Sequence, residues 1–176
     1  MDSTLYSLFY RYGIYVNIYL NTVFIMVTMS RGMIDITSKD FVYREAKARG
    51  KIILRPETIE MIKRGSIDKG DVIESSKVAA INAVKNTPYI LPYCHPIKIT
   101  GIDIDHILNR DYIEMSVTVK SIEQTGVEMD ALTGLMAGLL CIWDMVKKYE
   151  KDEEGNYPTT KIVDVHVEYK RKEIVK

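Results

Sequence analysis

Between residues 97 and 119 hydrophobic and polar positions alternate, which is the pattern of strands buried on one face. The first run carries Ile97, Ile99, Ile102 and Ile104, and its change of phase at Thr100-Gly101 predicts a β-bulge. Residues 106–112, HILNRDY, predict a turn, after which residues 113–119 alternate cleanly. The two strands are therefore expected to pair with each other.

In two further segments apolar residues recur at helical spacing. Asp71 is placed to cap a helix that Pro88 is expected to close, with an apolar face made of Val72, Ser76, Ala79, Ala80, Ala83 and Val84. The longest predicted helix runs from Glu128 to Tyr149, with a core face made of Leu132, Leu135, Met136, Leu139, Trp143 and Val146. Beside that face, Gly134, Gly138 and Cys141 form a stripe of small residues where another backbone can approach closely.

The remaining elements complete an α+β pattern. Residues 43–54 end in an apolar run typical of a strand, and a short helix is expected from Pro56 until Gly65 stops it. Residues 163–169 alternate as a last strand. This order of elements predicts a ferredoxin-like α+β fold, an antiparallel or mixed sheet with helices packed on one face.

The first 32 of the 176 residues differ from the rest of the chain. They hold five of the twelve tyrosines, and residues 12–29 carry no charge. That length is marginal for a membrane span, two asparagines and three tyrosines make it a poor one, and the β-branched residues suit a strand equally well. We expect residues 1–32 to be an extension upstream of a single domain at 33–176, with translation starting at Met29 or Met33, rather than an anchor.

Composition excludes several classes of function. Lys plus Arg and Asp plus Glu both number 24, so no overall field attracts nucleic acid or an anionic membrane. Two cysteines, Cys94 and Cys141, cannot make a disulfide framework, which favours a reducing, cytoplasmic location. Any anion must therefore bind to a local cluster of side chains.

The stretch ILPYCHPIKI, residues 90–99, sets Cys94 and His95 between two prolines and permits three interpretations. Adjacent residues are a poor chelating pair for zinc, and His106 and His166 are expected on distant strands, so no metal site is predicted. A nucleophile with its base is disfavoured because neighbouring side chains of an extended loop point apart, with Cys94 inward and His95 outward. A loop that holds one imidazole toward a substrate, and a purely structural histidine, both remain open.

Charged residues near helix ends are the other candidates. Lys69 precedes a helix start, where a phosphate would be favoured, although an exposed turn lysine explains it as well. Glu128 and Asp130 fit the first turn of the long helix by the helix dipole alone. Asp144 interrupts an apolar run and can contact Lys147, three residues on; we expect a carboxylate partly buried against Trp143, or else a surface ion pair.

Four motifs occur together in one order: KGDV, LPYCHP, TGVEMDALTG and IWDMVKKYEK. In this order and spacing the chain resembles the molybdenum cofactor biosynthesis protein C family, the cyclic pyranopterin monophosphate synthases, over about residues 33–169. The resemblance implies a ferredoxin-like homohexamer, a trimer of dimers, with active sites where subunits meet. It implies conversion of a cyclised dihydro-GTP triphosphate to cyclic pyranopterin monophosphate with release of pyrophosphate, by acid–base chemistry and without a resident cofactor or metal. Whether magnesium accompanies the triphosphate stays open.

The same resemblance assigns catalytic and substrate-binding roles to individual residues. Asp144, Lys69, Lys147 and His95 would be catalytic, and the substrate would be bound by Tyr93, Cys94, His95, Glu128, Met129, Asp130 and Arg44. The chain departs from the family in having Asp130 for Glu and Tyr93 for Leu. It also lacks a C-terminal Lys-Ser-Gly-Gly segment, which Lys170 or Lys172 would have to replace. The alternative function is a non-catalytic, oligomeric nucleotide-binding homologue.

Overall fold

The computed structural model describes residues 14–19, 22–27 and 32–174, in two units, Met1–Ile34 and Asp35–Lys176. In the first unit, β1 (Ile14–Tyr19) and β2 (Thr22–Val27) pair as an antiparallel hairpin. Strand and helix were both left open for this segment, and these two stretches are strands. The expectations about an extension and its start codon stay predictions, because most of residues 1–32 lie outside the described part.

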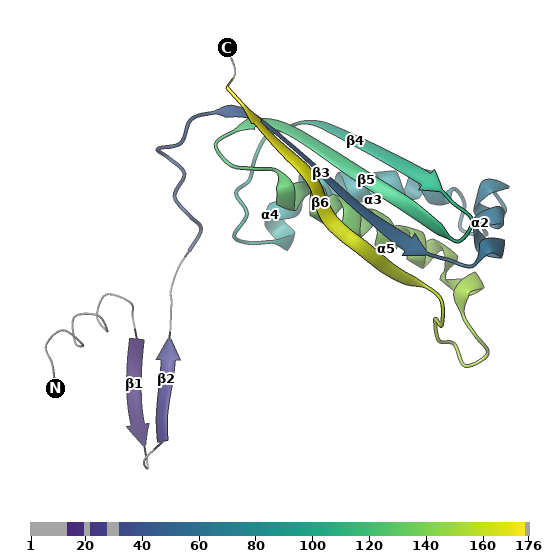
Figure 1. Cartoon of the computed structure of the whole chain (residues 1–176), viewed down its shortest axis with the longest axis horizontal. Helices are drawn as coiled ribbons and strands as arrows, with labels where there is room; N and C mark the ends of the chain where they lie inside the picture. Colours follow the sequence, from purple (N-terminus) through teal and green to yellow (C-terminus); the bar gives the residue numbers. More distant parts are fainter. Residues whose placement is uncertain (1–13, 20–21, 28–31, 175–176) are drawn as a thin grey trace, which may run out of the picture. The chain divides into compact units, whose positions relative to one another are not determined.

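The second unit is built on a four-stranded sheet (Figure 1). Its strands are β3 (Val42–Ile53), β4 (Ile99–Leu108), β5 (Tyr112–Glu123) and β6 (Lys161–Glu173), in the order β4-β5-β3-β6. Every neighbouring pair is antiparallel. The α+β, ferredoxin-like prediction is confirmed, with an antiparallel rather than a mixed sheet.

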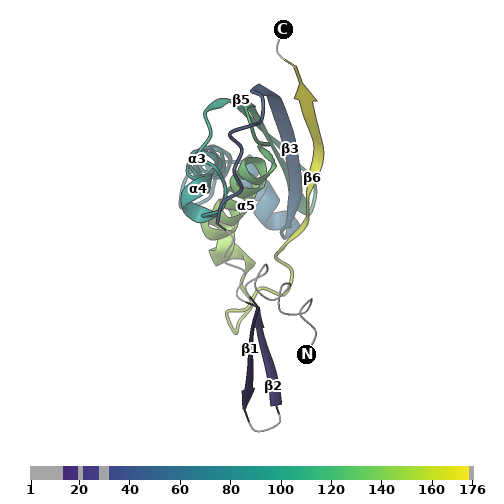
Figure 2. The same ribbon diagram turned by 90° about the vertical axis from the view of Figure 1, so that its left-hand side faces the viewer.

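Helices cover one face of this sheet and leave the other open (Figure 2). They are α2 (Pro56–Lys63), α3 (Val72–Lys85), α4 (Thr87–Ile90) and α5 (Glu128–Glu150). The alternating residues of β5, Ile113, Met115, Val117 and Val119, are fully buried beneath them. Period-two alternation in the sequence thus predicted which side of the central strands would face the core.

The core face of α5 is wider than its sequence pattern predicted. Leu135, Leu139 and Val146 are fully buried as expected, but Leu132, Met136 and Trp143 are only half-buried. Ile142 and Met145 are buried in their place. The reason is that α5 contacts α3 as well as the sheet, so two adjoining faces of the helix are covered.

The stripe of small residues on α5 is the surface against α3. A Cβ added at Gly134 would lie 3.2 Å from the Ala80 carbonyl oxygen, and one at Gly138 would lie 3.3 Å from that of Ser76. Larger residues would push the two helices apart. The predicted close approach of another backbone is confirmed.

Most of the expected boundaries are confirmed, with two corrections. Asp71 caps α3 by accepting from the Glu74 N–H at 2.9 Å, and the bulge lies between Ile99 and Gly101. Pro88 does not close α3, which ends at Lys85; instead it lies in the first turn of α4, where a missing N–H costs nothing. The turn expected at 106–112 is shorter, because β4 continues to Leu108.

Among the described helices, α5 alone is long and apolar enough to meet a length-and-hydropathy test for a membrane span. Half of the relevant window is buried inside the protein, against the sheet and α3. A core helix of a globular domain has the same composition, so α5 gives no argument for a membrane.

Candidate active site

Lys69, Asp144 and Lys147 form a cluster at the C-terminal half of α5. Lys147 lies one helical turn after Asp144, and its ammonium is 2.7 Å from Asp144 Oδ1. Lys69 comes from the turn before α3 and donates to Asp144 Oδ2 at 2.6 Å and to the Asp144 carbonyl at 2.8 Å. Gly70, with a φ of 98°, allows the sharp turn that brings Lys69 to the helix. One carboxylate thus holds two ammonium groups.

The two lysines decide the charge state of this cluster. Hydrogen bonds from Lys147 and Lys69 lower the pKa of Asp144 to about 2. The same carboxylate raises the pKa of Lys147. At neutral pH Asp144 is therefore ionised and Lys147 is protonated, so the cluster presents positive charge that can bind an anion.

Of the two environments expected for Asp144, the structure has the surface ion pair. Its side chain is 56% exposed, so it is not a carboxylate partly buried against Trp143. Trp143 instead meets the Tyr157 ring edge to face, with 5.5 Å between ring centroids. Successive helix residues point about 100° apart, so Asp144 faces solvent although its neighbours are apolar.

A second group of predicted residues lies at the start of α5. Asp130 is 5% exposed and lies beside Thr87, whose hydroxyl donates to the carbonyls of Val84 at 3.0 Å and Ala83 at 3.2 Å. Burial raises the pKa of Asp130 to about 6. Met129 beside it is 43% exposed. Asp130 is consequently a carboxyl group that can take up and release a proton near neutral pH.

Glu128 connects the start of α5 to two strands of the sheet. Its carboxylate pairs with Lys170 of β6 at 3.0 Å, and Arg44 of β3 is near enough to act on it electrostatically. Burial alone would raise the pKa of Glu128, but Lys170, a backbone N–H and Arg44 outweigh it and lower that pKa. Arg44 also donates to the carbonyls of Glu123 and Gln124, each at 3.3 Å. Of the two C-terminal lysines left open by the sequence, Lys170 pairs through its ammonium with Glu128, and Lys172 lies opposite Arg44 in the β3–β6 ladder.

The Cys-His loop lies near this second group. Cys94 and His95 are both half-buried, in contrast to the expected division into one inward and one outward side chain. Burial, and then the charge of Asp130, raise the pKa of the Cys94 thiol, which disfavours the thiolate that a nucleophile needs. Tyr93 is 70% exposed. The loop therefore presents an exposed aromatic ring, and its Cys94 lies close enough to Asp130 for that charge to act on the thiol.

These two groups cannot form one site within a single chain. Glu128 and Asp144 are sixteen residues apart on the straight axis of α5, which corresponds to about 24 Å. Lys69, Asp144 and Lys147 lie at one end of that axis. Glu128, Met129, Asp130, Cys94 and the Glu128 partners Arg44 and Lys170 lie at the other.

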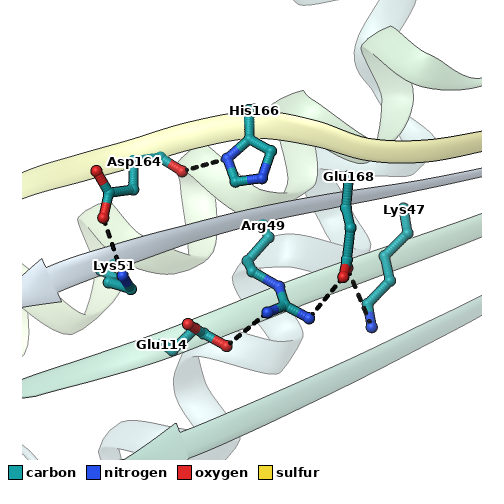
Figure 3. Close-up of polar contacts among 7 residues, drawn as sticks. All are labelled: Lys47, Arg49, Lys51, Glu114, Asp164, His166 and Glu168. Carbon is teal, nitrogen blue, oxygen red and sulfur yellow. Dashed lines mark hydrogen bonds and ion pairs between the residues drawn. The ribbon is translucent and has the colours of Figure 1, made fainter.

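The open face of the sheet also carries charges, but they neutralise one another (Figure 3). Side chains of β3 bridge acids of both flanking strands: Arg49 pairs with Glu114 (3.3 Å) and Glu168 (2.8 Å), Lys47 with Glu168 (3.4 Å) and Lys51 with Asp164 (2.9 Å). None of the predicted site residues lies in this network. It is best explained as a network of surface ion pairs.

Metal-ligating residues are not gathered anywhere in the described part of the chain, where no group of three or more His, Cys, Asp or Glu side chains is placed to hold an ion. His106 and His166 lie on β4 and β6, as expected. His166 Nδ1 contacts the Asp164 carbonyl at 2.7 Å. The absence of a cofactor remains a prediction.

His106, which the sequence predicted only as a strand histidine, is half-buried and contacts α3. Its Nε2 is 2.7 Å from Ser76 Oγ, and the Ser76 hydroxyl donates to the Ile73 carbonyl at 2.9 Å, so Nε2–H is the donor. Nδ1 has no partner within the described residues. Burial, followed by the charge of Lys77, lowers the pKa of His106 to about 4.

His106 and Asp130 are expected to act on stability in opposite directions. Between pH 4 and 6.5 the unfolded chain protonates His106 while the folded chain does not, so the free energy of unfolding rises with pH by about 3 kcal/mol from this group. Between pH 3.8 and 6 the folded chain holds a proton on Asp130 that the unfolded chain releases, so stability falls by a similar amount, about 3 kcal/mol. The two contributions nearly cancel.

Chemical denaturation of His106→Gln at several pH values separates the two contributions. The difference in unfolding free energy between the natural protein and this variant should shrink by about 3 kcal/mol from pH 6.5 to pH 4. His166→Gln, an exposed histidine on β6, is the matched control. A difference for His106→Gln that does not vary with pH would contradict a buried neutral imidazole.

The fold and these groups define a class of protein: an α+β domain whose clustered charged groups can bind an anion. Comparison with known proteins then gives the family. The model of the MoaC family matches residues 33–173, and the chain belongs to this family.

Three relatives show how far the similarity extends. A protein from Pyrococcus horikoshii is 53% identical over 135 residues, which cover 77% of this chain and 85% of the relative. A protein from Methanopyrus kandleri is 54% identical over 138 residues, which cover 77% of this chain and 88% of the relative. A protein from Methanococcoides burtonii is 50% identical over 143 residues, which cover 81% of this chain and 90% of the relative. All three are named "Probable cyclic pyranopterin monophosphate synthase".

Proposed function

We propose that this chain acts in molybdenum cofactor biosynthesis as a cyclic pyranopterin monophosphate synthase. Its substrate is (8S)-3',8-cyclo-7,8-dihydroguanosine 5'-triphosphate, and its products are cyclic pyranopterin monophosphate and pyrophosphate. Family membership and the names of its relatives support the activity. The observation that carries the proposal at the level of residues is the cluster of Lys69, Asp144 and Lys147.

The chemistry of the cluster suits the reaction. Loss of pyrophosphate leaves a highly charged group that cations stabilise, and Lys69 and Lys147 are two ammonium groups on one carboxylate. Rebuilding the ring system requires proton transfers at several atoms, and Lys147 becomes a better donor when it leaves Asp144, which raises its pKa. Asp144 keeps Lys147 protonated and directed to one place. Exchange of the Asp144 contact for a phosphate contact would then bind the substrate.

The group at the start of α5 supplies a carboxyl group that can exchange protons and further positive charge, in addition to the Lys69 cluster. Asp130 titrates at a pKa of about 6, which suits a group that accepts a proton and returns it. Arg44 and Lys170 add positive charge around Glu128. Tyr93, Cys94, His95 and Met129 form the substrate-facing wall in this proposal. No resident cofactor is required, and a magnesium ion would enter only with the triphosphate.

We further propose that the complete site forms between subunits of a homohexamer, a trimer of dimers. The separation of about 24 Å along α5 supports this, because a second chain can bring the start of its α5 to the Lys69 cluster of the first. Apolar side chains stand exposed beside the Cys-His loop: Tyr89 (88%), Ile90 (54%), Tyr93 (70%) and Met129 (43%). Such a surface fits contact with a second copy. With two free cysteines, Cys94 and Cys141, a cytoplasmic location is part of the proposal.

A single-turnover assay tests the proposed activity. Purified protein incubated with the cyclised dihydro-GTP should release one pyrophosphate for each cyclic pyranopterin monophosphate formed. Gel filtration with light scattering on the same sample should give the hexamer mass. Binding of the substrate without either product would identify a non-catalytic homologue and overturn the proposal.

A further inference from the structure

The turn that carries Lys69 is fastened to α5 by residues outside the predicted site. The Asp68 N–H donates to the Tyr149 hydroxyl at 3.1 Å, and the Lys148 ammonium pairs with the Asp68 carboxylate. Within the turn, the Gly70 N–H donates to the Ile67 carbonyl at 2.9 Å. We call Asp68, Lys148 and Tyr149 the turn clamp. The turn clamp holds the backbone at Asp68, one residue before Lys69.

Tyr149 is the rigid part of this clamp. Its ring is half-buried and packs against the hydrophobic core, and its hydroxyl reaches the surface. It accepts from the Asp68 backbone and also hydrogen-bonds the Asp68 carboxyl, whose pKa is lowered by Lys148 first and then by Tyr149. A phenol held by the core fixes a backbone position more firmly than a flexible surface side chain does.

The Lys69–Asp144 pair alone would hold the turn weakly. Both side chains are about half exposed, at 46% and 56%, and ion pairs in that setting gain little over hydration. Gly70 adds backbone freedom next to Lys69. A lysine side chain also loses much rotamer entropy when it is fixed. Ile67, which is 5% exposed in the core, and the start of α3 hold the two ends of the turn, and the turn clamp adds a contact to the backbone next to Lys69.

We propose that the turn clamp positions Lys69: Tyr149, supported by Asp68 and Lys148, holds the 67–71 turn against α5 so that the Lys69 ammonium meets Asp144. The importance of that position for turnover rests on the proposed function. Lys148 and Asp68 are 69% and 63% exposed, so their ion pair contributes less than the Tyr149 hydrogen bond. Tyr149 is accordingly the main positioning residue.

Tyr149→Phe tests this inference, since it keeps the packed ring and removes only the hydroxyl. Amide hydrogen exchange in residues 67–71 should become at least about tenfold faster, while exchange in the middle of α5 stays unchanged. With the cyclised dihydro-GTP, kcat should fall about tenfold with KM within about twofold. The melting temperature should move by no more than about 3 °C. Lys148→Met should lower kcat by only about twofold.

Tyr43→Phe is the matched control, because the Tyr43 hydroxyl also bonds a carboxylate, Glu45 Oε2 at 2.5 Å, but on the sheet. It should change neither exchange in residues 67–71 nor kcat. Unchanged exchange in Tyr149→Phe would show that the turn is not clamped, and faster exchange with an unchanged kcat would show that the clamp does not position Lys69; either overturns the inference. Failure of the proposed function is distinguished because the natural protein itself would then release no pyrophosphate.

Discussion

Asp144→Ala should lower kcat/KM for the cyclised dihydro-GTP by about a thousandfold. The carboxylate contacts both Lys69 and Lys147, so its loss frees two ammonium groups that then repel each other. Stability should change little, since the side chain is 56% exposed. Pyrophosphate release under single-turnover conditions and a thermal melt measure the two effects.

The charge of Asp144 has a further consequence for pH dependence. Because Asp144 raises the pKa of Lys147, removal of its charge lowers that pKa. The residual activity of Asp144→Asn should therefore decline at a lower alkaline pH than that of the natural protein. Asp103→Ala is the control: this aspartate is 61% exposed, pairs with Lys120 at 2.6 Å on the sheet, and should leave turnover unchanged. A variant at Asp144 with natural kcat/KM would remove this residue from the proposed mechanism.

Local sequence patterns predicted those parts of the site that depend on local geometry. Helical spacing placed Lys147 one turn after Asp144, and the Asp71 cap fixed where α3 begins. The contact between Lys69 and Asp144 joins residues 75 positions apart, and no local pattern encodes it. Family resemblance assigned both residues to one active site, but it did not predict that they contact each other.

The sequence predicted burial incorrectly on α5, which contacts more than one neighbouring element. An apolar run around Asp144 implied burial, yet α5 packs on both the sheet and α3, so its apolar residues cover two faces while Asp144 faces solvent. Tyr149 was predicted only as the last residue of the long helix. Its hydroxyl meets the backbone of Asp68, 81 positions away, and no local pattern encodes that contact.

The proposed active site joins the start of α5 from one chain to the Lys69 cluster at the other end of α5 in a second chain. Mixing two inactive variants tests this arrangement most directly. His95→Ala disables the group near the start of α5, and Asp144→Ala disables the Lys69 cluster. In a two-fold pair with one chain of each kind, one site carries both defects and the other carries none. Co-expression with two different tags and tandem purification yields such mixed assemblies.

The mixed assemblies should recover about a quarter of natural turnover, since about half of randomly formed pairs are mixed and each of these holds one intact site. Co-expression of Asp144→Ala with Lys69→Ala is the control, because both defects lie in the same cluster and no intact site can form. We expect recovery in the first mixture and none in the second. Turnover in the His95→Ala and Asp144→Ala mixture no higher than in either variant alone would contradict a site shared between chains.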